Sequence, residues 1–152
     1  TWTALAGCVV NPASGEVYTA TAGGGARLGE TPIRVADAVP LSQALVATGF
    51  AYDSTTRGEQ GRLVADLLPL VRDIRRLGTA SLDLCFVASG RTNAYFERTL
   101  SPWDHAAGAL IAREAGATVK GLGDAQPSRD LILAGHPDVA AALEGALAQL
   151  AR

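Results

Sequence analysis

Short apolar runs separated by turn residues open the chain. Thr3 to Val10 is one such run, Asn11 to Gly15 carries turn residues, and Glu16 to Thr21 is a second run. Two runs of this length around a turn predict a β-hairpin. Gly23-Gly24-Gly25 precedes another short apolar stretch and does not open a helix, so a flexible turn is favoured over a phosphate loop. The predicted meander continues through two further strands, Ala26 to Leu28 and Ile33 to Val35.

The rest of the chain alternates between short apolar runs and segments with helical spacing. In the first of these helical segments, Leu63, Val64, Leu67 and Leu68 recur on one side, and Pro69 ends it. The predicted strands are 44–48, 71–77, 94–96, 116–119 and 131–134, and the predicted helices are 55–68, 82–88, 102–115 and 138–150. This order predicts a single mixed α/β domain over residues 1–152, with helices covering a sheet.

Composition excludes several classes of function. The chain has 48% hydrophobic residues, enough to bury a core, and a net charge of −2, which gives no reason to expect a nucleic acid or an anionic membrane as partner. Lys120 is the single lysine, so no glycine-rich loop carries a Walker lysine. No apolar run approaches the roughly 18 residues that a membrane span needs.

The two cysteines, Cys8 and Cys85, lie in separate apolar elements. We expect both to be buried and reduced, which suits a cytoplasmic protein. A catalytic cysteine is disfavoured, because the two histidines, His105 and His136, are explained as residues at helix starts. The chain contains no methionine, so we expect Thr1 to be a processed end or the edge of a fragment.

The most informative stretch runs from Glu97 to Asp104. Ser101 is suited to cap a helix and Pro102 to be its first residue, which places Asp104 in the first turn. Ser101-x-x-Asp104 resembles a capping box, in which the carboxylate closes the helix start. Alternatively, Asp104 binds a metal ion, with a phosphate at the same exposed amides. The local spacing leaves both interpretations open.

A second candidate site is the small-residue turn Gly78-Thr79-Ala80-Ser81 before a helix. Thr79 can cap that helix, and small residues allow tight packing. The same geometry lets a ligand approach the backbone and offers helix amides to an anion. The preceding basic residues, Arg72, Arg75 and Arg76, are interpreted first as a solvated or ion-pairing edge and second as an anion-binding group.

Three segments together resemble the second half of an enzyme of the inositol monophosphatase family. They are Trp103-Asp104, the upstream segment from Gly78 to Cys85, and the downstream helix from Ala107 to Gly116 with its Glu-Ala-Gly end. The resemblance covers nearly the whole chain. It implies the C-terminal portion of a layered αβαβα sandwich and a Mg²⁺-dependent hydrolase of small-molecule phosphate monoesters. A homodimer is a further implication of the family.

The resemblance also implies roles for individual residues. Asp104 corresponds to a catalytic metal ligand of the family. Gly78, Thr79 and Ala80 fall on positions that contact the substrate's sugar-alcohol ring and the surroundings of its phosphate. Glu97, which taken alone reads as a solvated residue at a strand end, corresponds to a residue that accepts hydrogen bonds from substrate hydroxyls.

The family's other metal ligands come from a Glu-Glu pair and an Asp-Pro-Ile/Leu-Asp-Gly-Thr motif, and neither occurs here. Thr1-Trp2-Thr3 resembles the strand that follows that motif. We therefore expect residues 1–152 alone to be nearly inactive. Two alternatives stay open: another substrate of the same superfamily, such as a nucleotide 3′-phosphate, fructose bisphosphate or histidinol phosphate, and a noncatalytic domain that keeps the fold for assembly or regulation.

Overall fold

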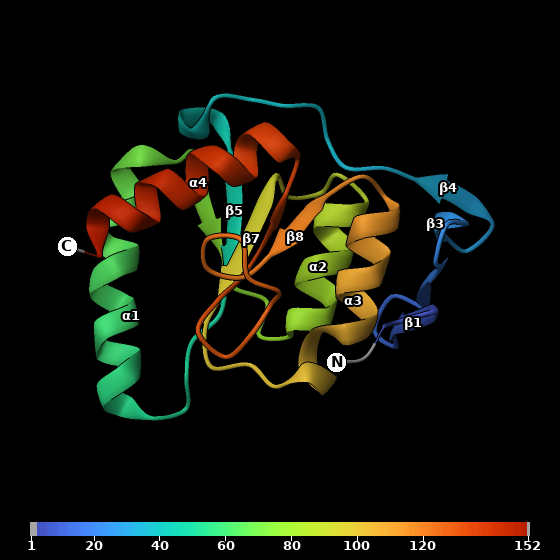
Figure 1. Ribbon diagram of the computed structural model, residues 1–152, viewed down its shortest axis with the longest axis horizontal. Helices are drawn as coiled ribbons and strands as arrows, with labels where there is room; N and C mark the ends of the chain where they lie inside the picture. The colour runs from blue at the N-terminus through green and yellow to red at the C-terminus, as the bar shows by residue number, and fades with distance from the viewer. Residues whose placement is uncertain (1–2, 152) are drawn as a thin grey trace.

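The computed structural model describes residues 3–151, so the segment Thr1-Trp2 lies outside the described residues (Figure 1). The chain begins with an antiparallel sheet in the order β1-β2-β3-β4. Its strands are β1 (Ala6–Asn11), β2 (Glu16–Thr21), β3 (Gly25–Leu28) and β4 (Thr31–Ile33). The predicted hairpin is confirmed, with Val9 opposite Tyr18. Gly23 and Gly25 turn the chain with positive φ angles of 74° and 78°, which glycine adopts without steric cost.

The last strand of this sheet ends earlier than predicted. Val35 is not part of β4, because its amide donates to the carbonyl of Ala115 at 3.0 Å and thereby leaves the sheet.

The second sheet is mixed and has the order β6-β5-β7-β9-β8. Its strands are β5 (Leu45–Thr48), β6 (Asp73–Arg75), β7 (Ala94–Glu97), β8 (Thr118–Lys120) and β9 (Ile132–Gly135). β5 runs parallel to both β6 and β7, whereas β9 is antiparallel to β7 and β8. The strand predicted over 71–77 is wrong in length, because β6 lies at the sheet edge and pairs with three residues of β5 only.

Four α-helices pack against the sheets. They are α1 (Ser54–Leu67), α2 (Ala80–Ala88), α3 (Pro102–Glu114) and α4 (Pro137–Leu150), with short 3₁₀ turns at Leu41–Gln43 and Leu68–Leu70. α2 begins two residues earlier than predicted, with Thr79 at its N-cap. None of the helices in the described part of the chain is long and apolar enough to cross a membrane.

The helices and sheets stack in layers because their apolar faces pack against one another. Figure 1 shows α1 and α4 on one side of the five-stranded sheet, and α2 and α3 between the two sheets. One core cluster joins α2 and α3 to both sheets, and a second joins the five-stranded sheet to α1 and α4. The order sheet, helices, sheet, helices makes four layers of the predicted αβαβα sandwich. No helix of residues 3–151 covers the outer face of the four-stranded sheet.

One prediction about the cysteines is wrong. Cys85 is fully buried in α2, and burial raises the pKa of its thiol to about 12. Cys8, however, is exposed. Neighbouring residues of a strand face opposite sides, and Val9 takes the inward position, so Cys8 points to the open face.

Candidate active site

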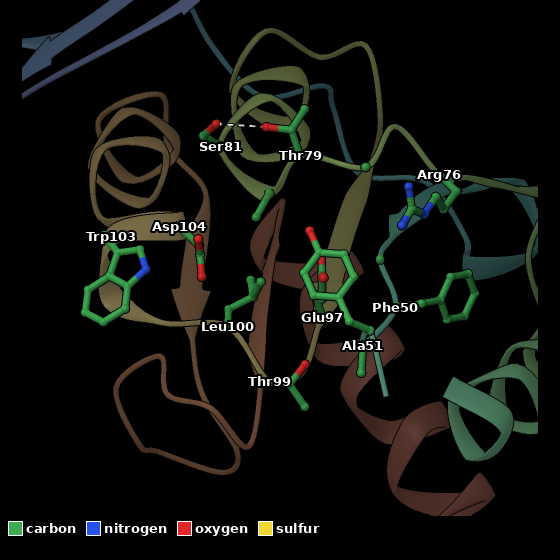
Figure 2. A pocket seen from close by; sticks show the side chains of 14 residues that line it. Phe50, Ala51, Arg76, Thr79, Ser81, Glu97, Thr99, Leu100, Trp103 and Asp104 are labelled. Carbon is green, nitrogen blue, oxygen red and sulfur yellow. Dashed lines mark hydrogen bonds between the residues drawn. The ribbon is translucent and has the colours of Figure 1, made fainter. Parts of the chain in front are cut away.

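A cavity of about 380 Å³ lies where β5 and β7 end and where α2 and α3 begin. The parallel pairing of β5 and β7 brings their carboxyl ends to the same edge of the sheet, where α/β proteins commonly bind ligands. The cavity contains all five predicted site residues. Its lining is Gly49, Phe50, Ala51, Tyr52, Arg76, Gly78, Thr79, Ala80, Ser81, Glu97, Thr99, Leu100, Trp103 and Asp104. Figure 2 shows Asp104 and Arg76 on opposite sides, with Glu97 between them.

The start of α2 forms one wall. Gly78 has a φ of +91°, which allows the chain to turn sharply into the helix. The Thr79 hydroxyl makes no hydrogen bond to a helix amide, and instead lies 3.1 Å from the hydroxyl of Ser81. The first amides of the helix are therefore not closed by the cap residue, an arrangement that favours anions at a helix N-terminus.

Asp104 forms a second wall from the first turn of α3. One carboxylate oxygen, Oδ2, accepts the amide of Ser101 at 2.8 Å, so the carboxylate does close the helix start as in a capping box. Asp104 also lines the cavity, and its second oxygen, Oδ1, accepts no hydrogen bond from the described residues. The two interpretations of Asp104 are thus compatible, because each needs one oxygen.

Glu97 is the last residue of β7 and is only 9% exposed, so it is not the solvated residue that its position in the sequence alone suggests. Its Oε2 accepts the hydroxyl of the fully buried Tyr95 at 2.6 Å. Burial raises the pKa of Glu97, and the Tyr95 hydrogen bond and the charge of Arg76 oppose that rise. A buried carboxylate with one hydrogen-bonded oxygen is an acceptor for a ligand hydroxyl.

Asp83 was not among the predicted site residues. It lies in the first turn of α2, is fully buried, and neither of its oxygens has a partner among the described residues. Burial and, to a smaller extent, the charge of Glu97 raise the pKa of Asp83 to about 7, whereas Arg76 lowers it. Helical spacing alone could not identify this residue, because it does not indicate which polar side chain of a short helix faces the sheet.

Two further parts of the lining were not predicted as site residues. Arg76 lines the cavity. Arg75, from the same group of basic residues, does not line it and instead forms an ion pair with Asp73 at 2.5 Å. The segment from Gly49 to Tyr52 has no sequence motif. The segment could have been identified from its position, because it directly follows β5, which pairs in parallel with β7.

The carboxylates of the cavity can be compared with what a Mg²⁺ ion needs. Mg²⁺ prefers carboxylate oxygens and keeps several waters, and Asp104 offers one oxygen of this kind. Within residues 3–151 no three His, Cys, Asp or Glu side chains are grouped so that they could hold a metal. The residues present therefore fit one corner of a Mg²⁺ site, and further carboxylates would have to come from elsewhere.

The cavity thus combines the open N-terminus of α2, the side chain of Arg76 and the carboxylates of Glu97 and Asp104. The model of the inositol monophosphatase family matches residues 2–152. The chain is 44% identical over 154 residues to inositol-1-monophosphatase of Mycobacterium leprae, covering 94% of this chain and 51% of the relative. The chain belongs to the inositol monophosphatase family.

Solved structures agree with this assignment. Inositol monophosphatase from Anabaena superimposes with a TM-score of 0.89 at 36% identity, covering 95% of this chain and 59% of that one. A Staphylococcus aureus inositol monophosphatase bound to inositol monophosphate superimposes with a TM-score of 0.79 at 26% identity, covering 92% and 55%. The chain spans about half the length of the curated relatives it matches.

Proposed function

We propose that this chain forms one half of the active site of a Mg²⁺-dependent phosphatase that hydrolyses inositol phosphate. The observation that carries the proposal is the cavity that Asp104, Glu97 and the start of α2 share. Asp104 would hold the metal, and its Oδ1 is the oxygen that is not used to cap α3. Gly78, Thr79 and Ala80 bring the backbone close to the phosphate and ring, and Glu97 accepts a ring hydroxyl.

The metal supplies the chemistry of hydrolysis in such an enzyme, since bound Mg²⁺ activates water and stabilises charge on the leaving oxygen. This chain's own contribution is to bind and orient. The remaining carboxylates would have to come from outside residues 1–152, so we expect these residues alone to bind substrate weakly and to turn it over negligibly. A cytoplasmic location, a homodimer and a single-domain organisation stay predictions.

The test is phosphate release from myo-inositol 1-phosphate with Mg²⁺, comparing residues 1–152 with the full natural chain. We expect activity in the full chain only, reduced roughly 100-fold or more by Asp104→Asn because a metal ligand is lost. Asp138→Asn is the matched control, because Asp138 also lies in the first turn of a helix that begins with proline but is exposed and outside the cavity.

Three results would change this proposal. Robust activity of residues 1–152 that Asp104→Asn abolishes would show that no other half is required. Full activity in Asp104→Asn would remove Asp104 from the site. A full natural chain that hydrolyses neither inositol phosphate nor a nucleotide 3′-phosphate, fructose bisphosphate or histidinol phosphate would favour the noncatalytic interpretation.

A further inference from the structure

The Glu97 carboxylate is enclosed by two residues, one that follows β5 and one within β7. On one side its atoms lie directly over Gly49, so closely that a Cβ at Gly49 would overlap all three atoms of the carboxylate. On the other side the Tyr95 hydroxyl donates to Oε2 at 2.6 Å. Gly49 follows β5 and Tyr95 lies in β7, so the enclosure exists only because these strands are neighbours.

Neighbouring contacts hold both Tyr95 and Gly49 in place. Tyr95 and Glu97 are two residues apart in β7 and therefore point to the same face of the sheet. The Tyr95 ring is fully buried in the core that contains α2 and α3. Thr48, which is 1% exposed, donates its hydroxyl to the Phe96 carbonyl at 2.8 Å and ties the end of β5 to β7 beside Gly49.

This arrangement distinguishes the two oxygens of Glu97. Oε2 is occupied by Tyr95, whereas Oε1 accepts no hydrogen bond from residues 3–151, although Glu97 lines the cavity. We propose that Tyr95 and Gly49 are positioning residues: together they hold the Glu97 carboxylate so that Oε1 is presented to a hydroxyl on the alcohol part of the substrate.

The proposal rests on the role given to Glu97 in the proposed function, and it makes a selective prediction. Holding Glu97 matters for a substrate whose alcohol part carries hydroxyls beside the phosphate. It does not matter for p-nitrophenyl phosphate, whose leaving group has no such hydroxyl. Loss of the positioning contact should therefore raise KM for the first substrate and leave the second unchanged.

The experiment compares Tyr95→Phe with the unaltered protein, both as the full natural chain. We expect KM for myo-inositol 1-phosphate to rise about tenfold with little change in kcat, the loss typical of a hydrogen bond to a charged group. The kinetics with p-nitrophenyl phosphate should not change. Tyr95→Phe combined with Glu97→Gln should be no worse than Glu97→Gln alone, because the two residues act as one unit.

Tyr18→Phe is the matched control. Tyr18 is also fully buried, and its hydroxyl has no partner in the described chain, so this variant loses a buried phenol hydroxyl without touching Glu97. Gly49→Ala should reproduce the selective loss, because its methyl group displaces the carboxylate. Gly58→Ala, where an added Cβ meets nothing within 4 Å, should not.

If Tyr95→Phe reduces activity on both substrates equally, or no more than Tyr18→Phe does, the role of Tyr95 is purely structural and the proposal is overturned. If the protein hydrolyses neither substrate, the proposed function fails, but the positioning role is still decided by NMR. The carboxyl ¹³C signal of Glu97 should then shift in Tyr95→Phe and stay in place in Tyr18→Phe. An unchanged Glu97 signal in Tyr95→Phe overturns the proposal.

Discussion

The two sheets of this protein differ in what covers them. The five-stranded sheet has helices on both faces, and all four residues of β7 and all four of β9 are buried. The four-stranded sheet is covered on its inner face by α3, where Gly7 lies against the backbone of Ala107. The difference appears within single strands, because Val9 is 8% exposed and its neighbour Val10 is 52% exposed.

The outer face of the four-stranded sheet is nevertheless apolar. Val10 and Val17 lie opposite each other and are 52% and 36% exposed, and Cys8 lies on the same face. Contiguous apolar side chains in water mark a surface suited to contact another surface. Apolar composition alone therefore does not locate the core, because a core forms only where helices cover a sheet. Polar groups inside the covered region are correspondingly costly.

The largest expected effect concerns Asp83, inside the covered region. Its pKa is raised from 3.8 to about 7 by burial, so the folded state binds this proton more tightly than the unfolded state. The resulting stability is fully present below pH 4 and is lost as the pH rises towards 7, by at most about 4 kcal/mol. The free energy of unfolding of Asp83→Asn, measured with urea between pH 4 and 8, should not show this loss.

Asp66→Asn is the control for that experiment, since Asp66 is exposed in α1 and forms no ion pair within the described residues. Its pH dependence should match that of the unaltered chain. If Asp83→Asn also follows the unaltered chain, Asp83 is not the buried acid that the structure describes.

A matched pair of substitutions compares the two sheets directly. Val46→Thr places a hydroxyl in the fully buried β5 and should lower the free energy of unfolding by about 2 kcal/mol, because the hydroxyl loses water. Val10→Thr makes the same change on the open face and should stay within about 0.5 kcal/mol. Chemical denaturation of both variants measures the difference. Equal losses would mean that the outer face is buried in solution.

The smallest effect concerns the ion pair that joins the two regions. Glu16 in β2 pairs with Arg91 after α2, and this hydrogen bond is the main cause that lowers the pKa of Glu16 to about 2. The contribution to stability is therefore present above pH 4.5 and lost as the pH falls through 2. Arg91→Gln should lower the melting temperature slightly at low salt, and the difference should shrink at high salt.

Arg34→Gln is the control for the ion pair. Arg34 pairs with Asp37 three residues away, and both side chains are largely exposed, so this pair joins no separate elements. A loss in Arg34→Gln as large as that in Arg91→Gln would argue that Glu16 and Arg91 do not anchor the four-stranded sheet.

Local patterns predicted most of the elements correctly. The turn residues between two apolar runs predicted the hairpin, and Ser101-Pro102 predicted the start of α3. The boundaries that were wrong depended on partners elsewhere. β6 is short because it has three partner residues, and Val35 leaves the sheet because Ala115 accepts its amide. Cys8 is exposed because α3 packs against the other side of the hairpin.

Short motifs around Gly78 and between Glu97 and Asp104 were enough to indicate the family and the five residues that line the cavity. What surrounds these residues depends on how distant parts of the chain pack. The register that sets Thr48 beside Phe96 brings Gly49 against Glu97, although 48 residues separate the two in sequence. The physical reason is that local periodicity fixes the direction of a side chain, whereas burial and hydrogen-bond partners depend on how distant strands and helices pack.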